Sequence, residues 1–399
     1  MVILYISSKR KKIYFIFYFS FIYFYYTYIL KEIINFKIKR EINKLNSFFK
    51  LCNDGILINN KKFKKVKYPK ISIISTIFNR EKFILRHLRS IQNQFFDDIE
   101  IIFIDDCSVD NSVKIIEYFQ KQDERITLIK QNKNKGTLIT RNIGILFSKG
   151  KYVIIPDSDD ILSQNILIIC YKLSINKNLE MIRFNSYKQA DKGKLIKIKY
   201  KIKKKYLYQP DISTFIFYGL GYLKTNDFAI SNKFIKRELF IRTLNYIDKF
   251  YLNQYMIVYE DSLINFALHC NAKKLYLLDK IGYYYLNNPK SITKRRVEKN
   301  EVLKYIFLYL KFIYENTKNN NYEKAIPFYL INKLTRNFKL IYSIKKNFKF
   351  YEKIINKYLN CKFINHYNKI KLLKIINLLK IREKSIKWIN YYNYYIFED

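Results

Sequence analysis

Residues 70–106, KISIISTIFNREKFILRHLRSIQNQFFDDIEIIFIDD, alternate between two kinds of sequence pattern. The stretch 70–78 is apolar and β-branched, residues 81–95 carry apolar side chains at helical spacing, and 98–106 is again apolar before two carboxylates. A continuous apolar run of this length is typical of a strand that is buried on both faces. The order strand, helix, strand predicts a βαβ unit with two parallel strands.

The same alternation continues along the chain. Residues 111–122, 136–150 and 161–174 have helical patterns, and the helix over 136–150 is expected to close on its final glycine. Residues 125–131 and 151–157 have strand patterns. We therefore predict an α/β, Rossmann-like fold with a mainly parallel central sheet and helices on both faces. Beyond about residue 180 the pattern becomes a mixture of strands and loops.

Polar side chains follow three of the predicted strands. Asn79 and Arg80 come after the first strand, Asp105 and Asp106 end the second, and residues 157–160, DSDD, end the fourth. In open parallel sheets, ligands bind beyond the carboxyl ends of the strands. The three groups are therefore expected to meet at one edge of the sheet.

The carboxylates of residues 157–160 suggest that a cation binds there. Like charges at close range repel by about 1 kcal/mol per pair even in water, so an unpaired cluster is unfavourable. The chain has no P-loop and no GxGxxG segment, and a bound phosphate would then need a metal. Mg²⁺ and Mn²⁺ prefer oxygen ligands and often bridge carboxylates to substrate phosphates. The alternative is a loop whose carboxylates cap the next helix.

Four segments in this order resemble the family 2 glycosyltransferases, which have the GT-A fold. They are ISIISTIFNREKFILRHLRSIQNQ, IEIIFIDDCSVDNS, NKGTLITRNIG and SKGKYVIIPDSDDIL, and the similarity covers roughly residues 70–190. The resemblance implies transfer of a sugar from a nucleotide diphosphate sugar, with UDP as the first choice of nucleotide. It also implies Mg²⁺ or Mn²⁺ as cofactor and inversion at the anomeric carbon.

The resemblance also implies roles for individual residues. Two differences from the usual family pattern are Cys107, in place of glycine, and STIFN, in place of Pro-Thr-Tyr-Asn. Cysteine is expected to fit a turn with positive φ less well than glycine. Residues implied at the nucleotide sugar are Thr76, Asn79 and Glu81 beside the nucleotide, Asp105 and Asp106 at the base, Asn134 and Arg141 near the base or phosphates, Asp157 at the ribose, and Asp160 at the donor sugar or metal; Asp157 and Asp159 are the implied metal ligands.

Some of these residues have a simpler interpretation. Asp106, Ser108 and Asp110 could cap the helix that follows them. Asp160 also lies where a helix cap is wanted, and Arg141 could be an ordinary surface residue.

A catalytic base is expected in the second half of the chain, because inverting transfer needs a carboxylate that removes a proton from the acceptor. In MIVYEDSLINFALHC, residues 256–270, Glu260 and Asp261 stand at a predicted strand end before a helix. Many family members carry such a pair, and the resemblance implies Asp261 as base and Glu260 as its neighbour. The alternative is that both acids only favour the helix N-terminus. Ser291 and Lys294 are implied, more weakly, to approach the diphosphate.

Residues 13–30, IYFIFYFSFIYFYYTYIL, contain no charged side chain and are flanked by basic residues. Eighteen residues without a charge are just long enough to span a hydrocarbon core about 30 Å thick. We therefore expect a single-pass N-terminal membrane anchor, in an endomembrane such as the ER or Golgi if the cell is eukaryotic. A cleaved signal peptide and a buried helix are the alternatives, and the orientation is left open.

The chain thus divides into four predicted parts. They are a tail and membrane anchor (1–30), a basic linker (31–68), a GT-A domain (69–295) with a nucleotide-binding half (70–190) and an acceptor half (190–295), and a helical C-terminal region (296–399).

Composition narrows the range of functions. The formal net charge of +42 could indicate nucleic acid as a partner, but the basic residues are scattered and no nucleic-acid-binding signature accompanies them. Lys, Asn, Ile, Tyr and Phe, whose codons are rich in A and T, are all abundant, which indicates codon bias instead. The five cysteines and three histidines lack metal-ligand spacing, so we expect free thiols and no zinc site.

The acceptor, whether glycan, lipid or protein, stays open. A nucleotidyltransferase-like enzyme and a non-catalytic interaction protein on the same fold are the alternative functions.

Overall fold

The computed structural model describes the central part of the chain. The predicted anchor at 13–30, most of the linker, Ser291, Lys294 and the C-terminal region lie outside it. None of the helices within the described part has the length and apolarity needed to cross a bilayer. The described residues are 63–189, 195–198, 206–208, 229–247 and 249–288.

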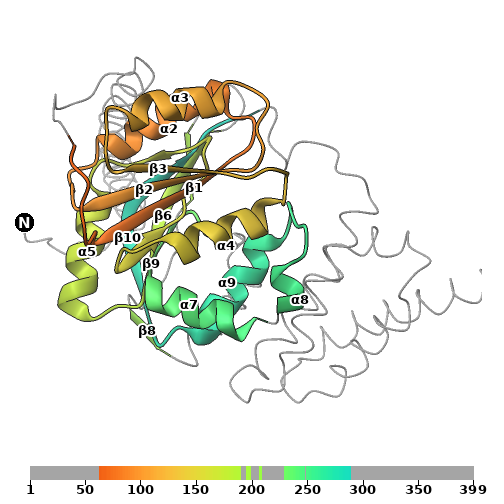
Figure 1. Cartoon of the computed structure of the whole chain (residues 1–399). Helices are drawn as coiled ribbons and strands as arrows, with labels where there is room; N and C mark the ends of the chain where they lie inside the picture. The colour runs from red at the N-terminus through yellow and green to blue at the C-terminus, as the bar shows by residue number, and fades with distance from the viewer. Residues whose placement is uncertain (1–62, 190–194, 199–205, 209–228, 248, 289–399) are drawn as a thin grey trace, which may run out of the picture. The chain divides into compact units, whose positions relative to one another are not determined.

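A single large sheet runs through this part of the protein and helices pack on it (Figure 1). The strands are β1 (Ile71–Ile77), β2 (Ile99–Asp105), β3 (Ile126–Lys130), β4 (Tyr152–Ile154), β5 (Ile161–Leu162), β6 (Met181–Gln189), β7 (Leu195–Ile198), β8 (Tyr206–Tyr208), β9 (Lys233–Lys236) and β10 (Lys274–Tyr285). The helices are α2 (Glu81–Gln92), α3 (Ser112–Gln120), α4 (Thr137–Phe147), α5 (Ile166–Lys177), α7 (Arg237–Tyr246), α8 (Lys249–Leu252) and α9 (Glu260–Asn271).

The strand order is β3-β2-β1-β4-β9-β6-β10-β5, with β7 beside β6 and β8 beside β10. The first four strands of this order are parallel, as predicted. β9 is antiparallel to both of its neighbours, and β5, β7 and β8 also pair in the antiparallel sense. β6 and β10 are again parallel to each other. The expectation of a mainly parallel sheet is therefore correct for β3-β2-β1-β4 and for the β6–β10 pair, and the described sheet as a whole is mixed.

Helices cover both faces of the sheet. α2 and α3 lie on one face, and α4, α7 and α9 lie on the other (Figure 1). Ile71, Ile73 and Ile77 of β1 belong to the core on the α2 side. Ile74 faces α4, where a Cβ added at Gly144 would lie 2.4 Å from the Ile74 side chain. The strand is thus buried on both faces, which explains its unbroken apolar sequence.

Two helix boundaries differ from the prediction. The helix predicted over 136–150 ends at Phe147, and Gly150 instead packs on β1, where an added Cβ would lie 2.5 Å from the Ser72 nitrogen. The helix predicted over 161–174 begins only at Ile166. The apolar pair before it forms β5, which pairs with Tyr283 and Tyr284 of β10. An apolar pair cannot be assigned to a strand or a helix by periodicity alone.

The end of the predicted linker packs on the domain. Phe63 forms a bridge with Asp123, and the Arg125 guanidinium lies 3.5 Å from the centre of the Phe63 ring. Arg125 also pairs with Asp123 at 2.9 Å. Phe63, which belongs to the predicted linker, therefore already packs on the domain.

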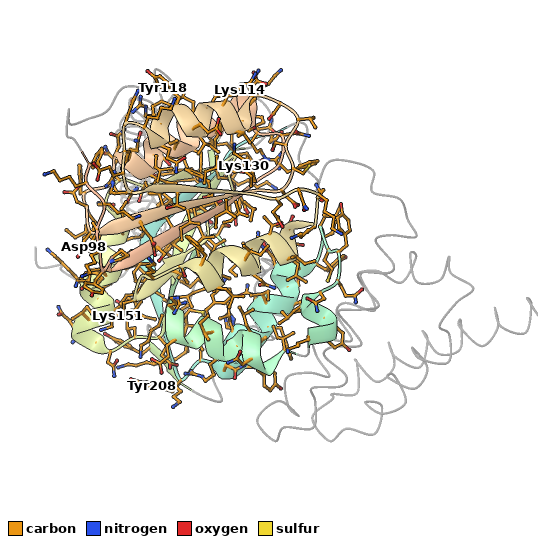
Figure 2. The ribbon with its side chains drawn as sticks, viewed as in Figure 1. Asp98, Lys114, Tyr118, Lys130, Lys151 and Tyr208 are labelled. Carbon is orange, nitrogen blue, oxygen red and sulfur yellow. The ribbon has the colours of Figure 1, made fainter. Side chains whose placement is uncertain are left out.

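The direction of the strands defines where a ligand can bind. Asp98 and Lys151 directly precede β2 and β4, and Figure 2 shows both at the same side of the molecule, away from Lys114 and Tyr118 on the outer face of α3. This arrangement is expected for parallel strands, since their amino ends share one edge. The carboxyl ends of β1, β2 and β4 therefore meet at the opposite edge.

Candidate active site

A cavity of about 360 Å³ lies at this carboxyl edge, between the end of β1, the loop after β4 and the first residues of α4 and α9. Six predicted site residues line it, and Arg80, which the sequence placed at a strand end without a role, lines it as well. The six are Thr76, Arg141, Asp157, Asp159, Glu260 and Asp261.

The Arg141 guanidinium lies among three carboxylates, those of Asp157, Glu260 and Asp261. Its side chain, on α4, is only 3% exposed, and its Nη1 donates a hydrogen bond to Asp261 Oδ1. The same nitrogen lies 3.8 Å from Glu260 Oε1, and Nη2 lies 3.5 Å from Asp157 Oδ1. Burial lowers the pKa of Arg141, but the three carboxylates more than offset this effect and raise it overall. Arg141 is therefore a permanent buried cation and not a surface residue.

The acids around Arg141 do not all carry charge at neutral pH. Burial and the nearby Asp261 raise the pKa of Glu260 to about 8, although Arg141 opposes the change. The same two causes raise the pKa of Asp157 to about 7. The Asp157 side chain is still 36% exposed, so water reaches it. Carboxylates of this kind lack sufficient positive charge nearby, and a divalent cation would supply it.

Contacts from β1 and α2 hold the loop of residues 157–160. Ser158 Oγ donates to the Thr76 carbonyl at 2.8 Å, and Arg86 donates to the Asp159 carbonyl at 2.8 Å. His87 Nδ1 lies 2.8 Å from the Asp160 carbonyl, which can only accept. This nitrogen therefore carries the proton. Burial lowers the pKa of His87 to about 4, so the ring is neutral at physiological pH.

Asp160 points away from the cavity. One carboxylate oxygen accepts from the Tyr283 hydroxyl and the other from the Leu286 N–H, both at 2.8 Å. Burial, together with Asp159 and Asp157, raises the pKa of Asp160 well above its usual range. In this structure Asp160 joins the loop to the end of β10, and it does not line the cavity.

Asp159 has two partners that the sequence did not predict. Its Oδ2 accepts a hydrogen bond from Asn288 Nδ2 at 2.6 Å, and Arg80 Nε lies 3.9 Å from the same oxygen. The contact of Arg80 could have been predicted from the sequence, because Arg80 directly follows Asn79 at a strand end. No sequence pattern pointed to Asn288, because its contact with Asp159 depends on where β10 ends.

The acids after β2 hold loops in place. Asp105 accepts from the Ser108 N–H at 3.1 Å. Asp106 accepts from the backbone N–H groups of Lys135 at 2.7 Å and Gly136 at 3.0 Å. Both side chains are buried and neither lines the cavity. Their predicted contact with the base stays a prediction. Neither acid caps α3, the helix that follows them, because Asp105 bonds within the loop after β2 and Asp106 bonds to the chain before α4.

Asn79, Glu81 and Asn134 also make local contacts outside the cavity. Asn79 accepts from the Val109 N–H at 2.9 Å, and Glu81 accepts from the Asn111 amide at 2.9 Å. Asn134 accepts from the Gly136 N–H at 3.1 Å. The three side chains hold the chain after β1, β2 and β3 in place, and they do not line the cavity with Asp157 and Asp159.

Cys107, in the loop after β2, and Tyr259, which lines the cavity, have left-handed backbone conformations that favour glycine. Cys107 has φ of 68°, so the cysteine adopts the positive φ that was expected to suit it poorly. Tyr259 has φ of 69° and directly precedes α9. The strand predicted before Glu260 is therefore wrong, because the chain reaches α9 through this turn. Left-handed backbone in bulky residues is uncommon and is concentrated at functional sites.

The residues present fit a divalent cation that shares its coordination with a substrate. No cluster of three or more His, Cys, Asp and Glu side chains within the described residues could hold an ion by itself. Asp157 and Asp159 supply two carboxylates to the same cavity. Magnesium sites often have one or two carboxylates and complete the coordination with phosphate oxygens and water.

The comparisons with known proteins find glycosyltransferases. A model of the family Glycosyl transferase family 2 matches residues 72–244. Glycosyltransferase GlyG of Streptococcus pneumoniae serotype 4 is 35% identical over 117 residues, 29% of this chain and 39% of that protein. The uncharacterized glycosyltransferase EpsJ of Bacillus subtilis is 29% identical over 235 residues, 57% of this chain and 63% of that protein. The chain thus spans less than two thirds of these relatives.

A further relative is the GalNAc(5)-diNAcBac-PP-undecaprenol beta-1,3-glucosyltransferase of Campylobacter jejuni, 39% identical over 93 residues, 23% of this chain and 30% of that protein. Among solved structures, S. aureus TarS 1–349 in complex with UDP-GlcNAc has a TM-score of 0.56 and 18% identity. The match covers 79% of this chain and 92% of TarS 1–349. At this identity the likeness shows the fold alone, which is the mixed α/β sheet of GT-A type.

Proposed function

Residues 72–244 belong to glycosyl transferase family 2, and from this premise we propose that the protein transfers a sugar from a nucleotide diphosphate sugar to an acceptor hydroxyl. One observation carries the proposal. The Asp157–Asp159 pair and the Glu260–Asp261 pair lie far apart in the sequence but line one cavity, with Arg141 between them.

The proposed donor is a UDP-sugar. TarS, which shares the fold, was crystallised with UDP-GlcNAc, and this supports UDP as the first nucleotide to test. Asp157 and Asp159 would hold Mn²⁺ or Mg²⁺, which supplies positive charge for the departing diphosphate.

Asp261 is the proposed base. Its carboxylate takes the proton from the acceptor hydroxyl while the hydroxyl oxygen forms a bond to the anomeric carbon. The bond from that carbon to the diphosphate breaks in the same step, and the electron pair leaves with the nucleoside diphosphate. A single displacement of this kind inverts the anomeric configuration. Arg141 orients Asp261 through the hydrogen bond from Nη1.

The remaining predictions extend this proposal. We propose that residues 13–30 anchor the protein in a membrane, which fractionation after carbonate extraction would test. The name of the Campylobacter relative describes an undecaprenol-diphosphate-linked acceptor, and such a lipid-linked acceptor would suit an anchored enzyme.

The alternative functions have less support. A nucleotidyltransferase-like enzyme would be expected to carry a Gly-rich segment with lysine after the first strand, where this chain has STIFNREKF. A non-catalytic protein would have no need to keep four acids around one cavity.

The direct test is turnover by the full-length chain. The protein would be incubated with Mn²⁺, a panel of UDP-sugars and lipid-linked or free glycan acceptors, and released UDP would be measured. The proposal expects acceptor-dependent UDP release that Asp261→Asn lowers by a factor of about 100 or more. Release that is equal in the variant would contradict the assignment of the base.

A further inference from the structure

The Tyr283 hydroxyl contacts two residues of the loop formed by residues 157–160, which we call the acidic loop. It accepts a hydrogen bond from the Asp157 N–H at 3.0 Å and donates one to Asp160 Oδ2 at 2.8 Å. A single oxygen atom therefore links the two ends of the four-residue loop. The loop is closed from its other side by the bond from the Asp160 N–H to the Asp157 carbonyl, at 3.0 Å.

The chain after Tyr283 adds two further contacts to the same loop. The Leu286 N–H donates to Asp160 Oδ1 at 2.8 Å, and Asn288 Nδ2 donates to Asp159 Oδ2 at 2.6 Å. Residues 283–288 thus contact Asp157, Asp159 and Asp160, which come more than 120 residues earlier.

The position of Tyr283 is well determined by its surroundings. The residue is fully buried and pairs with Leu162 of β5 and with Ser186 of β6. Its ring lies edge-on to the ring of Tyr285, at 4.7 Å between centroids. Strand pairing on both sides leaves the hydroxyl little freedom to move relative to the loop.

Tyr283 does not line the cavity, so it can affect a bound ion only through the loop. We propose that Tyr283 is a positioning residue that holds the loop of residues 157–160 in the form that binds a divalent cation. This inference rests on the proposed function, since it assigns a further residue to the metal-binding part of that site. Residues that orient metal ligands typically change metal affinity or activity by about 10- to 100-fold when they are replaced.

Tyr283→Phe is the sharpest variant, because it removes one oxygen and keeps the buried ring. Tyr152→Phe is the matched control. Tyr152 is also a buried strand tyrosine, and its hydroxyl bonds to Ser174, away from the acidic loop. Mn²⁺ would be titrated calorimetrically into the full-length proteins in the presence of UDP, and the unfolding temperature of each would be measured.

The expected result is a dissociation constant for Mn²⁺ that rises about 10-fold or more in Tyr283→Phe and changes less than about 2-fold in Tyr152→Phe. Both variants should have similar unfolding temperatures. Unchanged Mn²⁺ affinity in a folded Tyr283→Phe protein would overturn the inference.

Two other outcomes are distinguishable. If Tyr283→Phe does not fold, Asn288→Ala takes its place, and unchanged Mn²⁺ affinity in that variant overturns the inference. If the wild-type protein itself binds neither UDP nor Mn²⁺, the proposed function fails, and the inference fails with it.

Discussion

Arg141 and Asp261 are 120 residues apart in the sequence and form an ion pair inside the cavity. The pair joins α4, from the nucleotide-binding half, to α9, from the acceptor half. Asp261 is the proposed base, so the arginine that orients it also connects it to Asp157 of the acidic loop.

Replacing Arg141 should destabilise the protein. Arg141→Gln leaves Asp261, Glu260 and Asp157 without their shared cation, and breaking a buried ion pair typically costs about 3 to 5 kcal/mol. Urea unfolding of the metal-free protein would measure the loss. Arg242→Gln is the control, because Arg242 pairs with Glu180 at 3.0 Å but is 36% exposed, and exposed pairs contribute about 1 kcal/mol or less. Equal losses in the two variants would contradict the central role of Arg141.

Replacing Asp261 should affect catalysis and spare donor binding. Asp261→Asn keeps the shape of the side chain but cannot take up a proton, so transfer should fall by a factor of about 100 or more. The affinity for UDP, measured by calorimetry, should change little, because the base acts on the acceptor. Transfer within a factor of a few of wild type would show that another group removes the proton.

Glu260 should make stability depend on pH. Its pKa is raised from 4.5 to about 8 in the folded protein, so the folded state holds the proton more tightly than the unfolded state. The free energy of unfolding should therefore fall as pH rises from about 4.5 to about 8.

Glu260→Gln should remove that part of the pH dependence, which denaturant unfolding at several pH values would measure. Glu117→Gln serves as the control, since the Glu117 side chain is 41% exposed. The assignment would be wrong if the pH dependence of Glu260→Gln matched that of wild type.

Cys107→Gly should not destabilise the fold. Glycine accepts the φ of 68° at this position without the cost of about 1 kcal/mol that a side chain incurs there. This gain offsets the greater entropy that glycine loses on folding. Thermal unfolding should show a midpoint equal to or above that of wild type. A loss greater than about 1 kcal/mol would mean that the thiol makes a contact that outweighs the backbone strain.

Local pattern was sufficient to predict the first half of the fold. β1, β2 and β4 are continuous apolar strands, and their polar ends meet at one edge because parallel strands share direction. The antiparallel strand β9 could not be predicted, because its position between β4 and β6 depends on contacts across the whole domain.

The part of the site that is formed by residues adjacent in sequence could be predicted. The carboxylates at 157–160 indicated a site because like charges are seldom adjacent unless a positively charged partner is present. The contacts of Asn288 and Tyr283 were not visible, since they arise only when the end of β10 meets that loop. The inward position of Arg141 became clear only when three acids from separate segments surrounded it.

The most direct test of the account is calorimetric titration of UDP into the full-length protein, with and without Mn²⁺, for wild type and Asp159→Ala. The account predicts UDP binding that depends on Mn²⁺ and is lost in the variant, whose unfolding temperature stays near that of wild type. UDP binding of equal strength in wild type and Asp159→Ala would contradict the account. So would a wild-type protein that binds neither UDP nor GDP.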